Sequence, residues 1–199
     1  MSKRSKVSKK QRGKGISRGE MIVGLVIVVF AIWAVYSFSQ PPQTSTTTTS
    51  TNTIASGSAP DFTLPVVTAS GLNGQKVSLS SFRGKVVLLE FMEPWCSHCQ
   101  NMAPVLESLY QQYGAQNVVF LSVSGSWNGA TADDASKFIR DYHSNLMYVY
   151  DSSGTTFNAY GVTATPTFFI IDKNGQIATT YPGEVSAQTL AADLTRLNK

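Results

Sequence analysis

The stretch VVLLEFMEPWCSHCQNMAPVLESLYQQY, residues 86–113, decides the fold of this chain. It begins with a β-branched and apolar run, Val86–Phe91, that is typical of a buried central strand. It ends with apolar residues at helical spacing, namely Met102, Val105, Leu106, Leu109 and Tyr113. Between them lie the only two cysteines of the chain, Cys96 and Cys99, spaced C-x-x-C. The pair is therefore predicted where a strand passes into a helix.

A cysteine at the start of a helix is well placed to act as a thiolate. Free backbone amides and the positive end of the helix dipole favour an anion there. The thiolate is also the nucleophile of disulfide exchange. The dipole alone, worth about 0.3–1 kcal/mol, shifts the pKa of Cys96 by less than one unit. A larger shift needs His98 or direct hydrogen bonds to the sulfur.

Two other uses of a cysteine pair fit the sequence less well. A structural zinc site needs four ligands, and the only histidines that could join the cysteines are His98 and His143. A structural disulfide that closes so small a loop adds only about 2 kcal/mol in the chain-entropy account. A redox-active dithiol explains the pair better, and it needs neither a metal nor another cofactor.

The first 39 residues predict a membrane anchor. Residues 1–20 contain eight Lys and Arg against one acid, whereas residues 21–39 carry no charge. As a helix, residues 21–39 reach about 28 Å, close to the ~30 Å hydrocarbon core of a bilayer. The basic segment is then the cytoplasmic flank, and the rest of the chain lies outside the cytoplasm. A cleaved signal peptide is the alternative, although its apolar core is usually about 7–15 residues long.

The remainder divides into a linker and one domain. Residues 40–59 form a Ser/Thr-rich tract with two prolines, typical of a solvated tether. Residues 60–199 suffice for one domain with its own core. Beyond residue 20 there are eight basic and eleven acidic residues, so the net charge of +4 comes from the N-terminal segment. No nucleic-acid surface is predicted on the domain.

Alternating strand and helix patterns in the domain predict a sheet with helices on both faces. Strands are expected at 61–67, 76–79, 117–124, 146–150, 167–171 and 176–181, with a turn at 71–75. Helical segments are expected at 131–143, with Ala135, Phe138, Ile139 and Tyr142 inward, at 155–160, and at 186–197 with Ser186 as N-cap. The dipeptide Asn174-Gly175 indicates a hairpin between the last two strands.

Residues 60–199 resemble the thioredoxin-fold proteins, and most of all the membrane-anchored TlpA/ResA-like thiol-disulfide oxidoreductases. The resemblance rests on Glu90, Trp95, Cys96, Cys99, Pro104, Thr165-Pro166 and the hairpin, in this order. It implies an α/β fold with a central mixed sheet, helices on both faces and an N-terminal β extension. It also implies protein thiol or disulfide substrates and a redox partner in the membrane, and it suggests apocytochrome c thiols as one substrate.

The resemblance also implies a role for each matching residue. Cys96 is the attacking thiol, and Cys99 resolves the mixed disulfide. Glu90 matches the acid beneath the family's cysteine pair and shuttles the proton of Cys99. Pro166 matches the family's cis-proline, so that Thr165 presents a backbone edge with which a substrate chain can pair.

Residues around the cysteines are expected to shape the substrate surface. Trp95 shields the pair and offers an apolar face, with packing in the core as the alternative. Met92, Glu93 and Pro94 depart from the family's usual small or aromatic residues. We expect these three to change the surface beside the site.

The dipeptide between the cysteines bears on the direction of electron flow. His98 can stabilise the Cys96 thiolate and hence the reduced dithiol, which makes a stronger oxidant. Ser97-His98 resembles the oxidising DsbA and protein disulfide isomerase, whereas the anchor and Glu90 resemble reducing members. The sequence leaves the direction open.

Two functions of other classes use related folds. A copper-binding assembly factor of the Sco type needs C-x-x-x-C and a well-placed third ligand; this chain has one residue fewer, and His143 is its only distant histidine. A peroxidase of the peroxiredoxin type resembles P-x-x-x-T-x-x-C. Here Pro94 and Trp95 precede Cys96, and the loop has no Thr.

Overall fold

The computed structural model describes Trp33 and residues 57–199. The predicted basic segment 1–20, the predicted membrane span 21–39 other than Trp33, and the predicted linker up to residue 56 lie outside the described residues. Among the residues that are described, no helix combines the length and the apolar character needed to cross a membrane.

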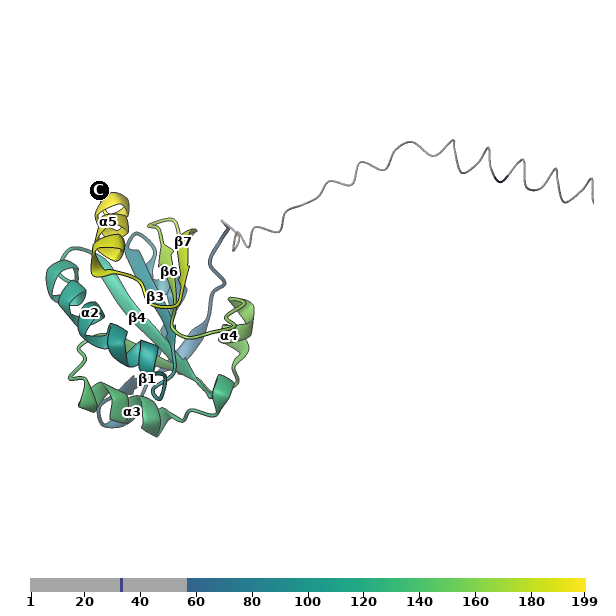
Figure 1. Ribbon diagram of the computed structural model, residues 1–199, viewed down its shortest axis with the longest axis vertical. Coiled ribbons are helices and arrows are strands. Elements are labelled where there is room, and N and C mark those ends of the chain that lie inside the picture. Colours follow the sequence, from purple (N-terminus) through teal and green to yellow (C-terminus); the bar gives the residue numbers. More distant parts are fainter. Residues whose placement is uncertain (1–32, 34–56) are drawn as a thin grey trace, which may run out of the picture. The chain divides into compact units, whose positions relative to one another are not determined.

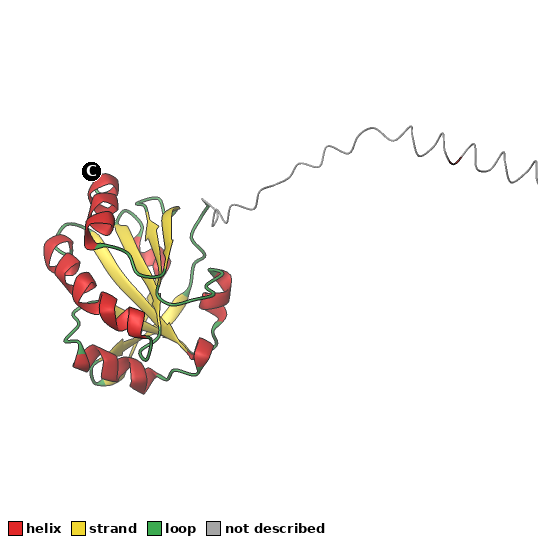
Figure 2. Ribbon diagram, in the orientation of Figure 1, coloured by secondary structure: helices red, strands yellow, loops and turns green. Residues whose placement is uncertain are grey.

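A seven-stranded mixed sheet, in the order β2-β1-β5-β4-β3-β6-β7, organises the domain (Figure 2). Inside it lies β3 (Val86–Met92), whose seven residues are all buried, as its apolar run predicts. β3 pairs in parallel with β4 (Val118–Gly125) and antiparallel with β6 (Thr167–Ile171). β5 (Met147–Asp151) continues the parallel part beside β4, and β7 (Ile177–Pro182) closes the other edge antiparallel to β6.

Helices cover both faces of the sheet, as predicted (Figure 1). One apolar cluster packs the sheet against α2 (Ser97–Tyr113), α3 (Ala132–Asp141) and α5 (Ala187–Leu197). A second cluster lies on the opposite face with α4 (Thr155–Ala159) and the 3-10 turn η1 (Leu79–Phe82). A further 3-10 turn, η2 (Ser126–Asn128), joins β4 to α3. The organising stretch therefore supplies a central strand and the longest helix packed on it.

Capping residues mark the N-terminal starts of the two shorter amphipathic helices, α3 and α5. Ser186 accepts a hydrogen bond from the Thr189 backbone N–H at 3.1 Å, which confirms it as the N-cap of α5. Thr131 and Asp134 form a reciprocal capping box at the start of α3. The prediction that Tyr142 points inward is wrong, because α3 ends at Asp141 and Tyr142 is 36% exposed. Its ring leans on Phe138, with 4.6 Å between ring centroids.

The N-terminal β extension is a hairpin of β1 (Thr63–Thr68) and β2 (Gly71–Ser78). The predicted turn at 71–75 is wrong, because these residues belong to β2 and the turn lies at 69–70. The Gly-rich sequence instead accommodates a register shift opposite Pro65–Val67. Gly74 has a φ of 79°, a conformation that favours glycine within an irregular strand. The hairpin predicted at Asn174-Gly175 is confirmed by the antiparallel pairing of β6 with β7.

Candidate active site at the start of helix α2

The two cysteines flank the point where the chain leaves β3 and enters α2. Cys96 is the N-cap residue of α2, with extended backbone angles, and its N–H donates to the Glu93 carbonyl at 3.0 Å. Cys99 lies in the first turn of the helix. Cys96 is partly exposed and Cys99 is 0% exposed, and both are free thiols. The strand-to-helix junction predicted from the sequence is confirmed. It leaves the Cys96 sulfur partly exposed and the Cys99 sulfur buried.

The helix start favours ionisation of Cys96. Burial opposes the charged form, but the backbone N–H groups of Cys99 and His98, with contacts from Thr165 and the Cys99 side chain, outweigh it and lower the pKa of Cys96. The amides that do this belong to the first turn of α2, where no carbonyl of the helix is available to accept from them. A thiolate at Cys96 is therefore stabilised by the backbone itself.

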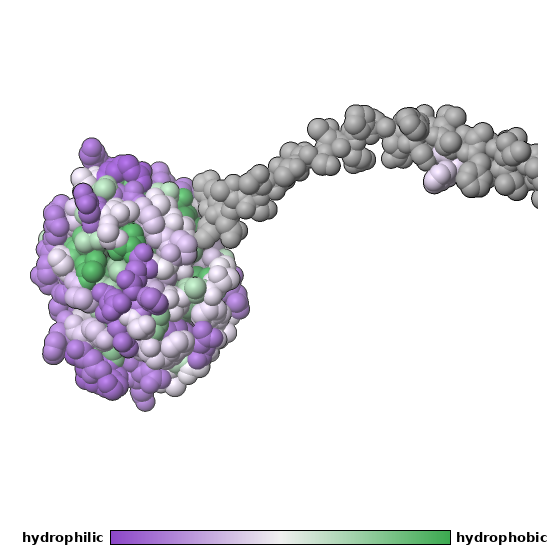
Figure 3. Space-filling view, in the orientation of Figure 1, coloured by the Kyte–Doolittle hydropathy of each residue, from purple (hydrophilic) through white to green (hydrophobic). Residues whose placement is uncertain are grey.

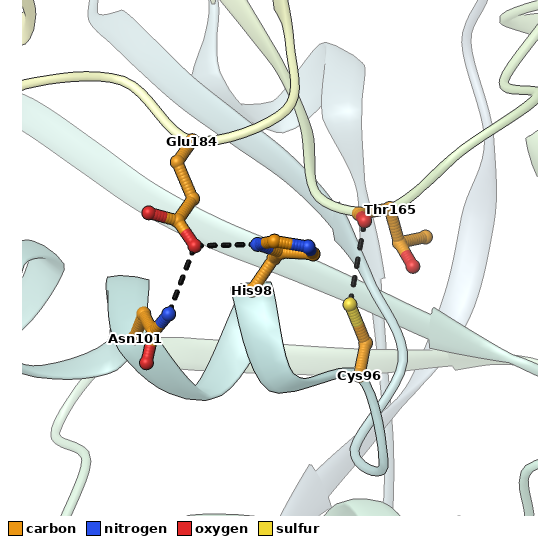
Figure 4. A network of polar contacts seen from close by, with 5 residues as sticks. All are labelled: Cys96, His98, Asn101, Thr165 and Glu184. Atoms are coloured by element: carbon orange, nitrogen blue, oxygen red, sulfur yellow. Dashed lines mark hydrogen bonds and ion pairs between the residues drawn. The ribbon is translucent and has the colours of Figure 1, made fainter.

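A loop far along the chain completes the surroundings of Cys96. The Thr165–Pro166 peptide bond is cis, and Pro166 is buried directly before β6. The Cys96 thiol donates a hydrogen bond to the Thr165 carbonyl oxygen, with 3.3 Å between Sγ and O (Figure 4). The structure thus brings Thr165 and the cis-proline Pro166 next to Cys96, as the resemblance implies.

Cys99 faces the core and a carboxyl group. Burial, followed by the charge of Glu90, raises the pKa of the Cys99 thiol well above its usual range. Glu90 is 2% exposed in the middle of β3, and burial raises its pKa to about 7. The Ser122 hydroxyl of β4 donates to its Oε2 at 2.7 Å, and this hydrogen bond opposes that rise. Glu90 is thus poised to take or give a proton near neutral pH.

His98 is anchored by a residue that sequence reasoning missed. Glu184, in the loop between β7 and α5, accepts hydrogen bonds from His98 Nδ1 at 2.6 Å and from Asn101 Nδ2 at 2.9 Å (Figure 4). Both donors lie in the first turns of α2, more than eighty residues earlier. Ser97, the first residue of α2, is exposed beside them. No sequence pattern marks Glu184, because only the path of the chain brings its loop to the cysteines.

Trp95 lies on the surface directly before Cys96. The face drawn in Figure 3 is mostly hydrophilic, with apolar side chains in small separate areas. Among the described residues, few large apolar side chains are exposed, and Trp95, at 54%, is one of them. It borders a groove of about 420 Å³, whose lining is Pro94, Trp95, Gln100, Asp134, Lys137, Phe138, Asp141 and Tyr142. This exposure excludes a role for Trp95 in the core and favours contact with substrates.

A second buried carboxyl lies three residues before Cys96. Glu93 is 0% exposed, and neither of its carboxyl oxygens has a hydrogen-bond partner among the described residues. Burial raises its pKa to about 7. The backbone N–H of Asn128, although not in hydrogen-bond geometry, is near enough to oppose this rise, and the Asp134 charge adds to it. Pro94 is buried but lines the groove beside Trp95, whereas the expectation that Met92 and Glu93 also shape the surface is wrong, because both are buried. They face inward since the chain turns under the start of α2 before it emerges at Trp95.

Other features lie away from this site or add no ligands to it. A cavity of about 580 Å³ lies near the amino ends of β4 and β5, bordered by Val118 and Met147, whereas the cysteines follow the carboxyl end of β3. Within residues 57–199 and at Trp33, no group of three His, Cys, Asp or Glu side chains is arranged to hold a metal ion.

Comparison with known proteins relates this geometry to a family. Residues 56–180 match the AhpC/TSA family. The chain is 34% identical over 142 residues to thiol-disulfide oxidoreductase ResA of Geobacillus thermodenitrificans, covering 71% of this chain and 77% of that protein. Among solved structures, it is similar to a thiol:disulfide interchange protein named DsbE from Chlorobium tepidum, with a TM-score of 0.65, 29% identity, and coverage of 73% and 99%. The exposed lipoprotein thioredoxin Etrx1 of Streptococcus pneumoniae is similar too, with a TM-score of 0.59, 30% identity, and coverage of 69% and 100%.

Proposed function

Because the chain belongs to the AhpC/TSA family and is a thiol-disulfide oxidoreductase of the ResA type, we propose that it exchanges thiols and disulfides with exported proteins while tethered to the membrane. Cys96 is the attacking thiol and Cys99 the resolving thiol. The tether is the uncharged segment 21–39, with the basic residues 1–20 on the cytoplasmic side. The catalytic domain then lies outside the cytoplasm, where protein disulfides form and persist.

The difference between the two sulfurs carries this proposal. Cys96 is partly exposed and its pKa is lowered, so it is both accessible and nucleophilic. Cys99 is buried and its pKa is raised, so it does not compete for substrates in solution. Such an arrangement suits a two-step exchange through a mixed disulfide.

In the reducing direction, the steps follow from these positions. The Cys96 thiolate attacks a substrate disulfide, a Cys96–substrate S–S bond forms, and the first substrate sulfur leaves and takes up a proton. Glu90 then accepts the proton of Cys99, whose thiolate attacks the Cys96 sulfur. The second substrate sulfur leaves, and the pair becomes a disulfide after giving two electrons to the substrate. Oxidation of a substrate dithiol is the same sequence reversed.

Substrates are held by backbone and apolar contacts in this proposal. The loop at Thr165–Pro166 offers a backbone edge next to Cys96, on which an extended peptide can pair. Trp95 adds an apolar face beside the sulfur. Both contacts tolerate many sequences, which fits an enzyme acting on several exported proteins. By analogy with the family, the thiols of apocytochrome c are one candidate substrate of this class.

The reduction potential of the Cys96–Cys99 pair assigns the direction. A value near the ~ −270 mV of thioredoxin makes the protein a reductant that receives electrons from a partner in the membrane. A value near the ~ −120 mV of DsbA makes it an oxidant of newly exported proteins.

Substitution of the resolving cysteine tests the exchange itself. Full-length Cys99→Ser expressed in membranes should accumulate mixed disulfides between Cys96 and exported proteins, because the second step is lost. The matched control, Cys96→Ser, should capture none, and reductant should release every captured protein. Equal capture by both variants, or none by Cys99→Ser, would contradict the proposal.

A further inference from the structure

Glu184 joins two segments that meet at the active site, yet the exchange steps above do not use it. It lies in the loop between β7 and α5, and its Oε1 atom accepts from both His98 and Asn101 of α2. The preceding Gly183 N–H donates to the Pro166 carbonyl at 2.7 Å, so this loop is also fixed to the cis-proline loop. The loop that carries Glu184 is therefore held both by α2 and by the cis-proline loop.

The contact determines which nitrogen of the His98 ring carries hydrogen. Hydrogen bonds from Asn101 and His98 lower the pKa of Glu184, so its carboxyl group is ionised and can only accept. Nδ1 of His98, at 2.6 Å from Oε1, must therefore be the N–H donor. In a neutral ring, this leaves Nε2 without hydrogen and able to accept a proton.

The same contact orients the ring toward the nucleophile. The side chains of His98 and Glu184 are 66% and 43% exposed, so an unanchored imidazole would exchange between rotamers. With Nδ1 turned to Glu184, the other ring nitrogen points to the side on which Cys96 and Thr165 lie (Figure 4). The carboxylate, the imidazole and the thiol thus follow one another in space, as in carboxylate–histidine–nucleophile arrangements of other enzymes.

We propose that Glu184 is a positioning residue for thiol-disulfide exchange, which holds His98 so that Nε2 accepts the proton of Cys96 and returns it to the departing sulfur. Before the attack, the Cys96 thiol turns from the Thr165 carbonyl oxygen, its S–H bond breaks, and Nε2 gains the proton, which leaves the attacking thiolate. The Cys96–substrate S–S bond forms while the substrate disulfide breaks. The departing thiolate then takes the proton from Nε2, and the neutral ring is restored. This role deepens the proposed exchange function and rests on it.

Direct electrostatics and this positioning role predict opposite changes in the reaction rate of Cys96 when Glu184 is replaced by Ala. Glu184→Ala removes a negative charge near the Cys96 thiolate, which by charge alone would speed its reactions. If Glu184 acts through His98, the same substitution frees the ring and slows them. An exposed pair of this kind supports a change of about threefold. Glu184→Gln keeps an oxygen that accepts from Nδ1–H, so it should retain most of the wild-type rate.

The test is the rate of Cys96 alkylation by iodoacetamide in the full-length, reduced protein in detergent between pH 6 and 8. We expect Glu184→Ala to be about threefold slower than wild type, Glu184→Gln close to wild type, and His98→Ala/Glu184→Ala equal to His98→Ala. Asn101→Ala is the matched control, since it removes a hydrogen bond from the same carboxylate oxygen without freeing His98. Nitrogen-15 spectra of labelled histidine should show the Nδ1–H form of His98 in wild type and its loss in Glu184→Ala.

Three outcomes would overturn the inference: Glu184→Ala alkylated as fast as wild type or faster, an equal slowing in the His98→Ala background, or unchanged histidine spectra. Because iodoacetamide needs no protein substrate, these results are independent of whether mixed disulfides are trapped. Failure of the positioning role and failure of the proposed function are therefore distinguishable.

Discussion

Cys96 and Cys99 are one helical turn apart, but they belong to opposite sides of the site. The exposed side consists of two hydrogen-bonded pairs at the protein surface, Cys96 with Thr165 and His98 with Glu184. The buried side consists of Cys99, Glu90, Glu93 and Ser122, enclosed by the sheet and α2. Identical thiols thus acquire a lowered pKa on one side and a raised pKa on the other. The backbone amides at the start of α2 lower the pKa of Cys96, whereas burial and the Glu90 charge raise that of Cys99, so the C-x-x-C spacing alone does not create the difference.

Glu90→Gln should have the largest effect on the buried side. The amide cannot accept the proton of Cys99, so we expect resolution of the mixed disulfide to slow by about 10²-fold. Since the pKa of Glu90 is about 7, the wild-type rate should rise with pH through about 7 as the carboxyl group loses its proton. In Glu90→Gln this rise should be absent. Rapid-mixing measurements of substrate release from a preformed mixed disulfide provide the rates.

Ser122→Ala is the matched control for Glu90. It removes the hydrogen bond that favours the charged carboxylate, so the midpoint of the wild-type profile should move to higher pH while the profile keeps its shape. A Glu90→Gln profile identical to that of wild type would show that the buried side needs no proton acceptor at this position.

Glu93→Gln should change the pH dependence of stability, which is a property of the buried side distinct from catalysis. Burial raises the pKa of Glu93 from 4.5 to about 7 in the folded state, so its ionisation opposes folding. Stability should therefore fall as the pH rises from about 4.5 through 7, and the full loss is about 3–3.5 kcal/mol. Glu93→Gln should remove this part of the loss. Urea unfolding of the full-length protein at pH 5 and pH 9 measures the difference.

The exposed acid Asp133 on α3 supplies the comparison for Glu93. Asp133→Asn should change the free energy of unfolding little, because this side chain is exposed on the surface of α3. If Glu93→Gln and Asp133→Asn behaved alike, the unpaired buried carboxyl would have no measurable effect on stability.

Trp95→Ala should produce the smallest change, and it should affect the exposed side alone. Loss of the apolar face beside Cys96 should raise the KM for a protein substrate severalfold, which corresponds to about 1 kcal/mol of lost contact. Alkylation of Cys96 by a small reagent should be unchanged. Trp95 is 54% exposed, and among the described residues it is not one of the hydrogen-bond partners that lower the pKa of Cys96. An equal loss in both assays would instead indicate a distorted helix start.

Local sequence signals predicted those parts of the fold and site that depend on neighbouring residues. The apolar run of β3, the helical spacing of α2 and the C-x-x-C motif place Cys96, Cys99 and Glu90, and the Ser186 cap marks the start of α5. The Gly71–Gln75 turn was mispredicted because glycine serves an irregular strand as well as a turn. The residues that act at a distance carry no such signal.

Glu184 and Glu93 illustrate what local patterns leave out. Glu184 reaches His98 only because β7 and the loop after it return to the start of α2. Glu93 precedes an exposed tryptophan, so its own complete burial depends on how the turn packs against η2 and α3. The roles of both acids depend on tertiary contacts, which residue type and local sequence do not reveal.

Alkylation of the two cysteines across a pH range tests the central difference most directly. The reduced full-length protein in detergent is treated briefly with iodoacetamide between pH 4 and 10, and each cysteine is quantified by peptide mass spectrometry. The structure predicts that Cys96 reacts with a midpoint below the ~8.5 of a free cysteine, while Cys99 stays unmodified in the folded protein. Comparable modification of Cys99, or a Cys96 midpoint at or above that of a free thiol, would contradict the account.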